Sequence, residues 1–142
     1  MGKLAIVYWS GTGNTQAMAE AVLAGAQEAG AQAQLYTAAE FDAGALAELD
    51  AVVFGCPAMG AEVLEEDEFA PLFDACKPAL QGKSVALFGS YGWGDGEWMR
   101  NWEQDCLAAD AKRIAESVIC CEAPDDDALA ACRALGKAAA AV

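Results

Sequence analysis

Short apolar runs alternate along the chain with longer segments of helical periodicity, and this alternation restricts the fold more than any other feature. Runs rich in Val, Ile, Leu and Phe predict strands, and the segments between them predict helices. Near-continuous apolar strands are typical of a parallel sheet covered by helices on both faces. The predicted strands are 4–9, 33–36, 51–55, 84–89 and 117–121, and the predicted helices are 15–29, 68–80, 97–109 and 126–139, with a short helical piece at 42–49.

Residues at the predicted helix ends agree with this assignment. Gly30, Gly82 and Gly136 stand where a helix or turn is expected to end, and the acidic run 125–127 after Pro124 is typical of a helix N-terminus. Strict alternation with right-handed crossovers predicts a three-layer, doubly wound α/β fold with a five-stranded parallel sheet. At 142 residues, the chain is expected to form a single domain spanning 1–142.

Charge and cysteine content exclude several functional classes. A formal net charge of −14 argues against binding to nucleic acid or anionic membranes, and predicts partners with basic surfaces. The six cysteines form no C-x-x-C pair and there is no histidine, so a thioredoxin-type, zinc or iron–sulfur site is not indicated. No apolar run reaches the ~20 residues that span a bilayer, and the start of the sequence shows no export signal. We therefore expect a cytoplasmic protein with reduced thiols.

The first of three unusual loops follows the first predicted strand and opens a helix. Its sequence, Trp-Ser-Gly-Thr-Gly-Asn-Thr at 9–15, contains no lysine or arginine. It lacks the lysine of an ATP-binding P-loop and the third glycine of the dinucleotide fingerprint. Its hydroxyls and backbone amides suit a phosphate monoester at a helix N-terminus. The alternative is an ordinary polar turn capped by Asn14 or Thr15.

The second loop, 55–62, follows the third predicted strand and reaches the same edge of the sheet. Met59 places a polarizable side chain beside Gly60, which allows a backbone hinge, and Glu62 is able to accept a hydrogen bond from a ring N–H. Taken singly, Met59 also fits a core methionine and Glu62 a solvated carboxylate. The loop becomes informative only together with its neighbours.

The third loop, 89–96, follows the fourth predicted strand and is rich in glycine. Glycines leave the rings of Tyr91 and Trp93 little local cover, so a planar ligand is their expected partner. The alternative is a surface loop with an exposed tryptophan. On the following predicted helix, Trp98, Met99 and Trp102 are instead expected in the core.

These three loops resemble the FMN-binding segments of short-chain flavodoxins from anaerobic bacteria. The matching segments are Y-W-S-G-T-G-N-T at 8–15, G-C-P-A-M-G at 55–60 and L-F-G-S-Y-G-W-G-D-G at 87–96. The resemblance covers essentially the whole chain and implies the strand order 2-1-3-4-5 and one non-covalently bound FMN. The cofactor-binding residues that it implies are Ser10, Gly11, Thr12, Gly13, Asn14, Thr15, Pro57, Ala58, Met59, Gly60, Ala61, Glu62, Ser90, Tyr91, Gly92, Trp93 and Gly94.

The same resemblance assigns roles to these positions. The first loop is expected to hold the phosphate through Ser10, Thr12, Asn14 and Thr15, with Pro57 and Ala58 at its border. The isoalloxazine ring is expected between Met59 and Trp93, with Glu62 at N3–H and the backbone of 90–94 near N1 and O2. The carbonyl of Gly60 is expected to turn toward N5–H after the first electron.

Two positions depart from some relatives. Pro57 replaces a serine, which removes one hydrogen-bond donor to the phosphate. Ala61 replaces a polar or acidic residue, which leaves the energy of the peptide turn at Gly60 and the stability of the semiquinone open. Cofactor affinity is therefore expected to depend more on the first loop.

The resemblance implies an electron-transfer protein and not an enzyme. We expect a low-potential, one-electron carrier that moves between the semiquinone and hydroquinone forms of FMN and links larger redox enzymes. Acidic residues in or beside the loops are expected to oppose the second electron, although they also fit a merely solvated surface. Partners are expected to be reductases and ferredoxin-using oxidoreductases with basic patches, met transiently by a monomer.

Two other functions share this topology. An FMN-dependent NAD(P)H:quinone oxidoreductase requires a substrate pocket over the flavin, for which the chain lacks insertions. A signalling receiver domain requires an acidic cluster after the first strand, where this chain has Ser-Gly-Thr-Gly. The electron carrier therefore remains the favoured hypothesis.

Overall fold

A computed structural model of the chain describes residues 3–11, 13–59, 63–92, 94 and 96–142. Strands and helices alternate through most of this part of the chain. In order, the elements are β1 (Lys3–Tyr8), α1 (Asn14–Glu28), β2 (Gln32–Thr37), the 3-10 helix η1 (Ala43–Glu48), β3 (Ala51–Gly55), α2 (Phe69–Cys76), the 3-10 helix η2 (Lys77–Ala79), β4 (Ser84–Tyr91), α3 (Glu97–Ala108), β5 (Lys112–Arg113), β6 (Val118–Cys121) and α4 (Asp126–Ala140).

The strands form a parallel sheet in the order β2-β1-β3-β4-β5, as predicted. The fifth position is more complex than predicted, because two short strands share it. β5 pairs with the start of β4 and β6 pairs with its end, from Phe88 to Tyr91. The predicted strand 117–121 corresponds to β6. The chain therefore runs through two successive strands before α4, and strict alternation is broken there.

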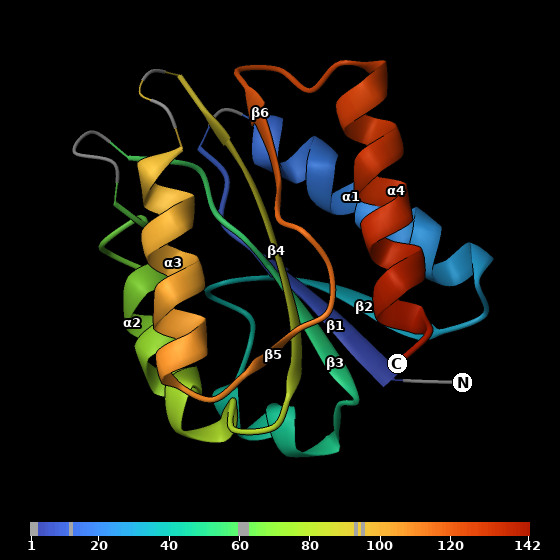
Figure 1. The fold of residues 1–142 in the computed structure, drawn as a ribbon, viewed down its shortest axis with the longest axis vertical. Coiled ribbons are helices and arrows are strands. Elements are labelled where there is room, and N and C mark those ends of the chain that lie inside the picture. The colour runs from blue at the N-terminus through green and yellow to red at the C-terminus, as the bar shows by residue number, and fades with distance from the viewer. Residues whose placement is uncertain (1–2, 12, 60–62, 93, 95) are drawn as a thin grey trace.

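Helices cover both faces of the sheet, giving three layers (Figure 1). Successive side chains of a strand point to opposite faces, and β1 shows the result clearly. Leu4 and Ile6 pack with α1 and α4 in one buried cluster, whereas Ala5 and Val7 pack with α2, α3 and η1 in the other. Trp98, Met99 and Trp102 lie in the second cluster, which confirms their predicted place in the core.

The ends of α1, α3 and α4 lie within one residue of the predicted ends, but the prediction for one glycine is wrong. Gly30 and Gly82 adopt the left-handed backbone conformation expected after a helix or turn, with φ of 90° and 73°. The Asp125 side chain accepts a hydrogen bond from the Ala128 N–H and caps α4 as predicted. The prediction for Gly136 is wrong, because this residue lies inside α4. A Cβ there would lie 2.0 Å from the Val22 carbonyl oxygen of α1, so the glycine serves close helix packing.

Two of the predicted helices are shorter than expected. The segment 68–80 divides into α2 and the tighter turn η2, which has a proline in its first turn. The short piece at 42–49 is the 3-10 helix η1, and Asp42 caps it by accepting a hydrogen bond from the Gly44 N–H.

Candidate functional site

The loops after β1, β3 and β4 meet at the carboxyl edge of the sheet, where its strand order reverses between β1 and β3 (Figure 1). Ligands of doubly wound folds bind at this kind of edge. The local geometry of each loop explains how its side chains are positioned.

The first loop leaves the N-terminus of α1 open. Gly13 occupies the N-cap position with φ of 95° and gives the helix no capping side chain, and the first turn carries no acidic residue. The Ser10 hydroxyl closes the loop by accepting a hydrogen bond from the Gly13 N–H at 3.0 Å. Backbone N–H groups at an uncapped helix start attract anions, so this end of α1 is suited to a phosphate.

A buried pair of hydroxyls joins α1 to the third loop. Thr15 Oγ1 lies 3.1 Å from Ser90 Oγ, and the two residues are only 1% and 4% exposed. Each hydroxyl is able to donate or accept, so one donates to the other, and the O–H of the accepting residue stays available for a further acceptor. It fixes the first turn of α1 against the end of β4.

The second loop continues alongside β4 beyond the end of β3. The Cys56 N–H donates to the Phe88 carbonyl at 3.2 Å, and the Ala58 N–H donates to the Ser90 carbonyl at 3.0 Å. Gly89 allows this close approach, because a Cβ there would lie 2.2 Å from the Cys56 carbonyl oxygen. The indole N–H of Trp98 donates to that same oxygen at 3.1 Å.

Met59 and Val63 hold the two sides of the second loop together. The Met59 N–H donates to the Val63 carbonyl at 2.9 Å, which forms an isolated antiparallel bridge. The bridge fixes Met59, which is half-buried, at the mouth of the site.

Glu65 secures the chain between this bridge and α2. Its carboxylate accepts hydrogen bonds from the N–H groups of Asp67, Glu68 and Phe69 at 2.7–2.8 Å, and the residue is 5% exposed. Burial raises the pKa of the Glu65 carboxyl, but the three N–H donors outweigh it and lower the pKa overall. Glu65 is therefore an ionised cap that holds the start of α2.

The three loops enclose a cavity of about 310 Å³. This volume lies at the lower end of the range found for ligand pockets. The lining combines the aromatic and thioether side chains of Trp9, Tyr91 and Met59 with the polar side chains of Asn14, Ser90 and Glu122. The lining residues are Trp9, Gly11, Asn14, Pro57, Ala58, Met59, Ser90, Tyr91, Gly92 and Glu122.

Most of the predicted site residues that the structure describes meet at this cavity. Gly11, Asn14, Pro57, Ala58, Met59, Ser90, Tyr91 and Gly92 line it. Thr15 supports it through Ser90, and Gly13 forms the N-cap of α1. Ser10 lies beside it in a neighbouring polar cavity, and Gly94 is exposed with φ of 90°. The predicted residues Thr12, Gly60, Ala61, Glu62 and Trp93 lie outside the described residues.

Two residues at the cavity were not predicted as site residues. The indole of Trp9 lines both this cavity and the neighbouring one, and its N–H donates to the Glu68 carboxylate at 3.0 Å. Glu122 also lines the cavity, has a left-handed backbone with φ of 60°, and donates a hydrogen bond from its N–H to the Tyr91 carbonyl at 2.7 Å. Its position directly after the last strand was the available signal for Glu122.

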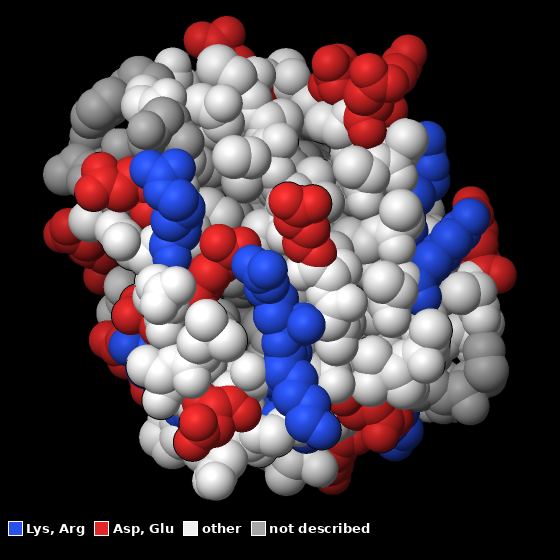
Figure 2. All heavy atoms as spheres, viewed as in Figure 1, with Lys and Arg blue, Asp and Glu red and all other residues white. Residues whose placement is uncertain are grey.

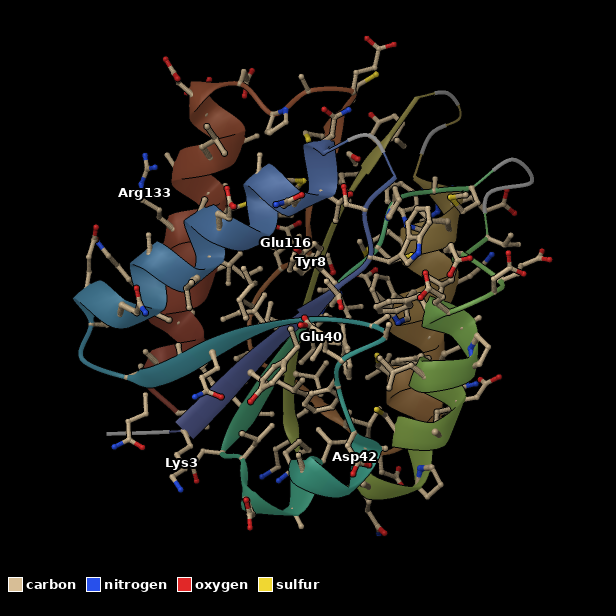
Figure 3. The ribbon with its side chains drawn as sticks, turned by 180° about the vertical axis from the view of Figure 1, so that it is seen from behind. Lys3, Tyr8, Glu40, Asp42, Glu116 and Arg133 are labelled. Atoms are coloured by element: carbon tan, nitrogen blue, oxygen red, sulfur yellow. The ribbon has the colours of Figure 1, made fainter. Side chains whose placement is uncertain are left out.

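The neighbouring cavity is polar. It is lined by Tyr8 and Thr37, the last residues of β1 and β2, and by Glu68, among others, and Glu40 follows three residues after Thr37. Tyr8 and Glu40 are both labelled in Figure 3. Burial, followed by the carboxylates of Glu20 and Glu40, raises the pKa of Tyr8. The phenol is therefore neutral at pH 7 and contributes an uncharged polar group to the cavity lining.

Other chemistries find little support in the part of the chain that the structure describes. Burial raises the pKa of the Cys56 thiol to about 12, so this cysteine beside the site is not a nucleophile. Among the described residues, no three His, Cys, Asp or Glu side chains are grouped so that they could bind a metal ion. None of the described helices is long and apolar enough to cross a membrane.

Comparisons with known proteins identify one family. The family model described as flavodoxin matches residues 6–136. The flavodoxin of Megasphaera elsdenii is 44% identical over 135 residues, which cover 95% of this chain and 96% of that protein. The flavodoxin of Clostridium beijerinckii is 50% identical over 99 residues, which cover 70% and 72% of the two chains. The solution structure of two-electron reduced M. elsdenii flavodoxin superposes with a TM-score of 0.90 and covers 98% of this chain and 99% of that one.

Proposed function

Because this chain belongs to the flavodoxin family, it is an FMN-containing electron-transfer protein, and we propose that the cavity at the carboxyl ends of β1, β3 and β4 is its cofactor site. The bound FMN supplies the redox chemistry, since its ring accepts and returns electrons. The residues of the cavity suit both the phosphate and the ring of this cofactor. Family membership does not favour the quinone oxidoreductase alternative.

The observation that carries this assignment is the open N-terminus of α1 beside uncharged polar side chains. A phosphate there would accept hydrogen bonds from backbone N–H groups and from Ser10, Asn14 and Thr15, and the helix dipole favours its charge. The Thr15–Ser90 pair keeps this first turn in place. We assign Thr12 to the same phosphate from its place in the family motif.

The apolar side of the cavity suits the ring. Trp9, Met59 and Tyr91 provide flat or polarizable surfaces that exclude water, and the bridge between Met59 and Val63 limits their movement. From their places in the family motif, we assign Met59 and Trp93 to the two ring faces and Glu62 to N3–H. We assign to the Gly60 carbonyl the switch toward N5–H.

Carboxylates near the cavity favour a low reduction potential. Glu66, Asp67 and Glu68 are exposed beside the second loop, and Glu122 lines the cavity itself. A negative charge that develops about 4 Å from a carboxylate costs ~1 kcal/mol in water and about 4 kcal/mol at an effective dielectric constant of 20. Since ~1.4 kcal/mol corresponds to about 59 mV for one electron, such carboxylates make the reduced protein a stronger reductant.

Charge also defines the partners that we propose. The formal net charge is −14, and on the face in Figure 2 basic side chains lie over β5, α3 and α4 while acidic ones gather at the start of α4. Partners with basic patches, such as reductases and ferredoxin-using oxidoreductases, would be attracted over about a Debye length and released quickly. We propose that residues 1–142 act as one monomeric domain. All six cysteines are free thiols, which supports a reducing compartment such as the cytoplasm.

Comparison of FMN with riboflavin tests the phosphate assignment. Two or more charge-assisted hydrogen bonds and the helix dipole together contribute about 3 kcal/mol or more, so FMN should bind at least ~100-fold more tightly than riboflavin. Flavin fluorescence during titration of the FMN-free protein gives both dissociation constants.

Two threonine-to-valine variants test which hydroxyl contributes to the preference for FMN over riboflavin. Thr15→Val should reduce the preference for FMN about tenfold, because it removes one phosphate donor and the partner of Ser90. Thr37 lines the neighbouring cavity, and its hydroxyl donates to the Glu40 carboxylate. Thr37→Val should therefore leave the preference for FMN unchanged. Equal affinities for FMN and riboflavin in the unmodified protein would show that the phosphate is not bound here.

A further inference from the structure

The indole of Trp9 connects the first loop to the start of α2. Its N–H donates a hydrogen bond to the Glu68 carboxylate at 3.0 Å, across 59 residues of sequence. The same ring packs over the backbone of Gly11, because a Cβ on Gly11 would lie 3.0 Å from Cη2 and 3.2 Å from Cζ3 of Trp9. The backbone of Trp9 is fixed separately, since its N–H donates to the Gly55 carbonyl at 3.0 Å.

Glu65 anchors the other end of this connection. Glu68 occupies the N-cap position of α2, but its side chain makes no capping hydrogen bond. The buried Glu65 carboxylate takes that role, because it accepts hydrogen bonds from the N–H groups of Glu68 and Phe69 at 2.7 and 2.8 Å. The exposed Glu68 carboxylate accepts from Trp9 instead. Since the backbone of Glu68 is already fixed, fewer torsions have to be ordered to make this bond.

Trp9 also joins the two cavities at this edge of the sheet. Among the described residues it alone lines both, together with Gly11 in the cofactor cavity and with Glu68 in the neighbouring one. Glu68 therefore acts on the cofactor cavity through the indole.

We propose that Glu68 is a positioning residue for the phosphate of FMN, because it holds the Trp9 indole against Gly11 and so orders the first loop. This role rests on the cofactor site proposed above. Gly11 and Gly13 give the loop a flexible backbone, and ordering such a backbone costs conformational entropy. An indole fixed on the loop reduces that cost when the phosphate binds, because the loop is ordered beforehand.

The charge of Glu68 acts in the opposite direction, because a carboxylate repels a phosphate. Two substitutions separate the charge from the hydrogen bond. Glu68→Gln removes the charge but keeps a side-chain oxygen that is able to accept from the Trp9 N–H. Glu68→Ala removes both the charge and the acceptor. The difference between these two uncharged variants therefore measures the effect of the acceptor.

Flavin fluorescence titration of the full-length, FMN-free variants with FMN and with riboflavin tests this role. The measured quantity is the ratio of the two dissociation constants, in which effects on the shared ring cancel. The preference for FMN should be about three- to tenfold lower in Glu68→Ala than in Glu68→Gln, as expected for one hydrogen bond. In a Trp9→Phe background, which lacks the indole N–H, the same two Glu68 variants should differ less than about twofold.

Asp67→Asn and Asp67→Ala form the matched control pair, because Asp67 is an exposed neighbour in the same acidic run. Their preferences for FMN should agree within about twofold. Riboflavin binding by each variant shows that it is folded.

Two results would overturn the role of Glu68 and leave the phosphate site standing. One is an equal preference for FMN in Glu68→Ala and Glu68→Gln, and the other is a difference between them that persists in the Trp9→Phe background. Equal affinities of the unmodified protein for FMN and riboflavin would refute the phosphate site and this role together.

Discussion

Removal of the Glu65 carboxylate should destabilise the protein strongly, although Glu65 lies in a loop beside exposed acidic residues. Its two oxygens accept three backbone hydrogen bonds at the start of α2, and the residue is 5% exposed. At ~1 kcal/mol net for each bond, Glu65→Ala should lower the free energy of unfolding by about 2–4 kcal/mol. Glu65→Gln keeps the oxygen shared by Glu68 and Phe69 but loses the bond from Asp67, so about 1–2 kcal/mol is expected.

Urea unfolding at pH 7, followed by tryptophan fluorescence at a fixed excess of FMN, measures both values. Glu66→Ala is the matched control, because Glu66 is an exposed neighbour, and its change should stay within about 0.5 kcal/mol. The reasoning is refuted if Glu65→Ala costs no more than Glu66→Ala.

The pH dependence gives a second check on Glu65. Its pKa in the folded protein is lowered from the ordinary value of 4.5, since the three N–H donors outweigh burial. The unfolded state therefore binds the proton more readily, and the stabilisation is present above pH 4.5 and is lost as the pH falls through the lowered pKa. The stability of Glu65→Ala should fall less steeply with pH in this acid range than that of the unmodified protein.

Three further outcomes follow from the packing and the charge. Gly136→Ala should destabilise the protein by more than about 2 kcal/mol in thermal unfolding, although alanine favours helices, because its Cβ would lie 2.0 Å from the Val22 carbonyl oxygen. Gly89→Ala should weaken FMN binding at least about tenfold by fluorescence titration, because its Cβ would push the Cys56 carbonyl out of the second loop. Stopped-flow electron transfer to a basic acceptor protein should slow as salt rises, and an unchanged rate would argue against electrostatic attraction.

Buried elements were the part of the fold that the sequence could predict. β3 has the predicted bounds because its five residues are all apolar or small and fully buried. β5 was missed, because Lys112 and Arg113 are exposed at the sheet edge and carry no strand-like apolar signal. Gly136 was misassigned as a helix break because nothing in its local sequence reveals that Val22 of α1 packs against it. Contacts between distant elements override local preference at such positions.

At the candidate site, too, the residues of local sequence motifs could be predicted, whereas contacts between distant residues could not. The placement of Asn14 and Met59 at the cavity was predictable because both belong to contiguous loop motifs beside strands. Trp9 belongs to the first loop motif, but its hydrogen bond to Glu68, 59 residues away in the sequence, could not be read from the motif. Glu122 follows the last strand, but nothing in the sequence shows its left-handed backbone. The cap formed by Glu65 was likewise hidden in a run of acidic residues, where only burial distinguishes it from its exposed neighbours.

Anaerobic reductive titration of the FMN-loaded protein, followed by visible absorption, tests most directly the claim that the chain carries single electrons. The account predicts a long-wavelength band from half-reduced flavin that rises during the first equivalent of electrons and then falls slowly as reduction continues. Direct bleaching without that band would contradict one-electron transfer, and a purified protein that binds no FMN would contradict the cofactor site itself.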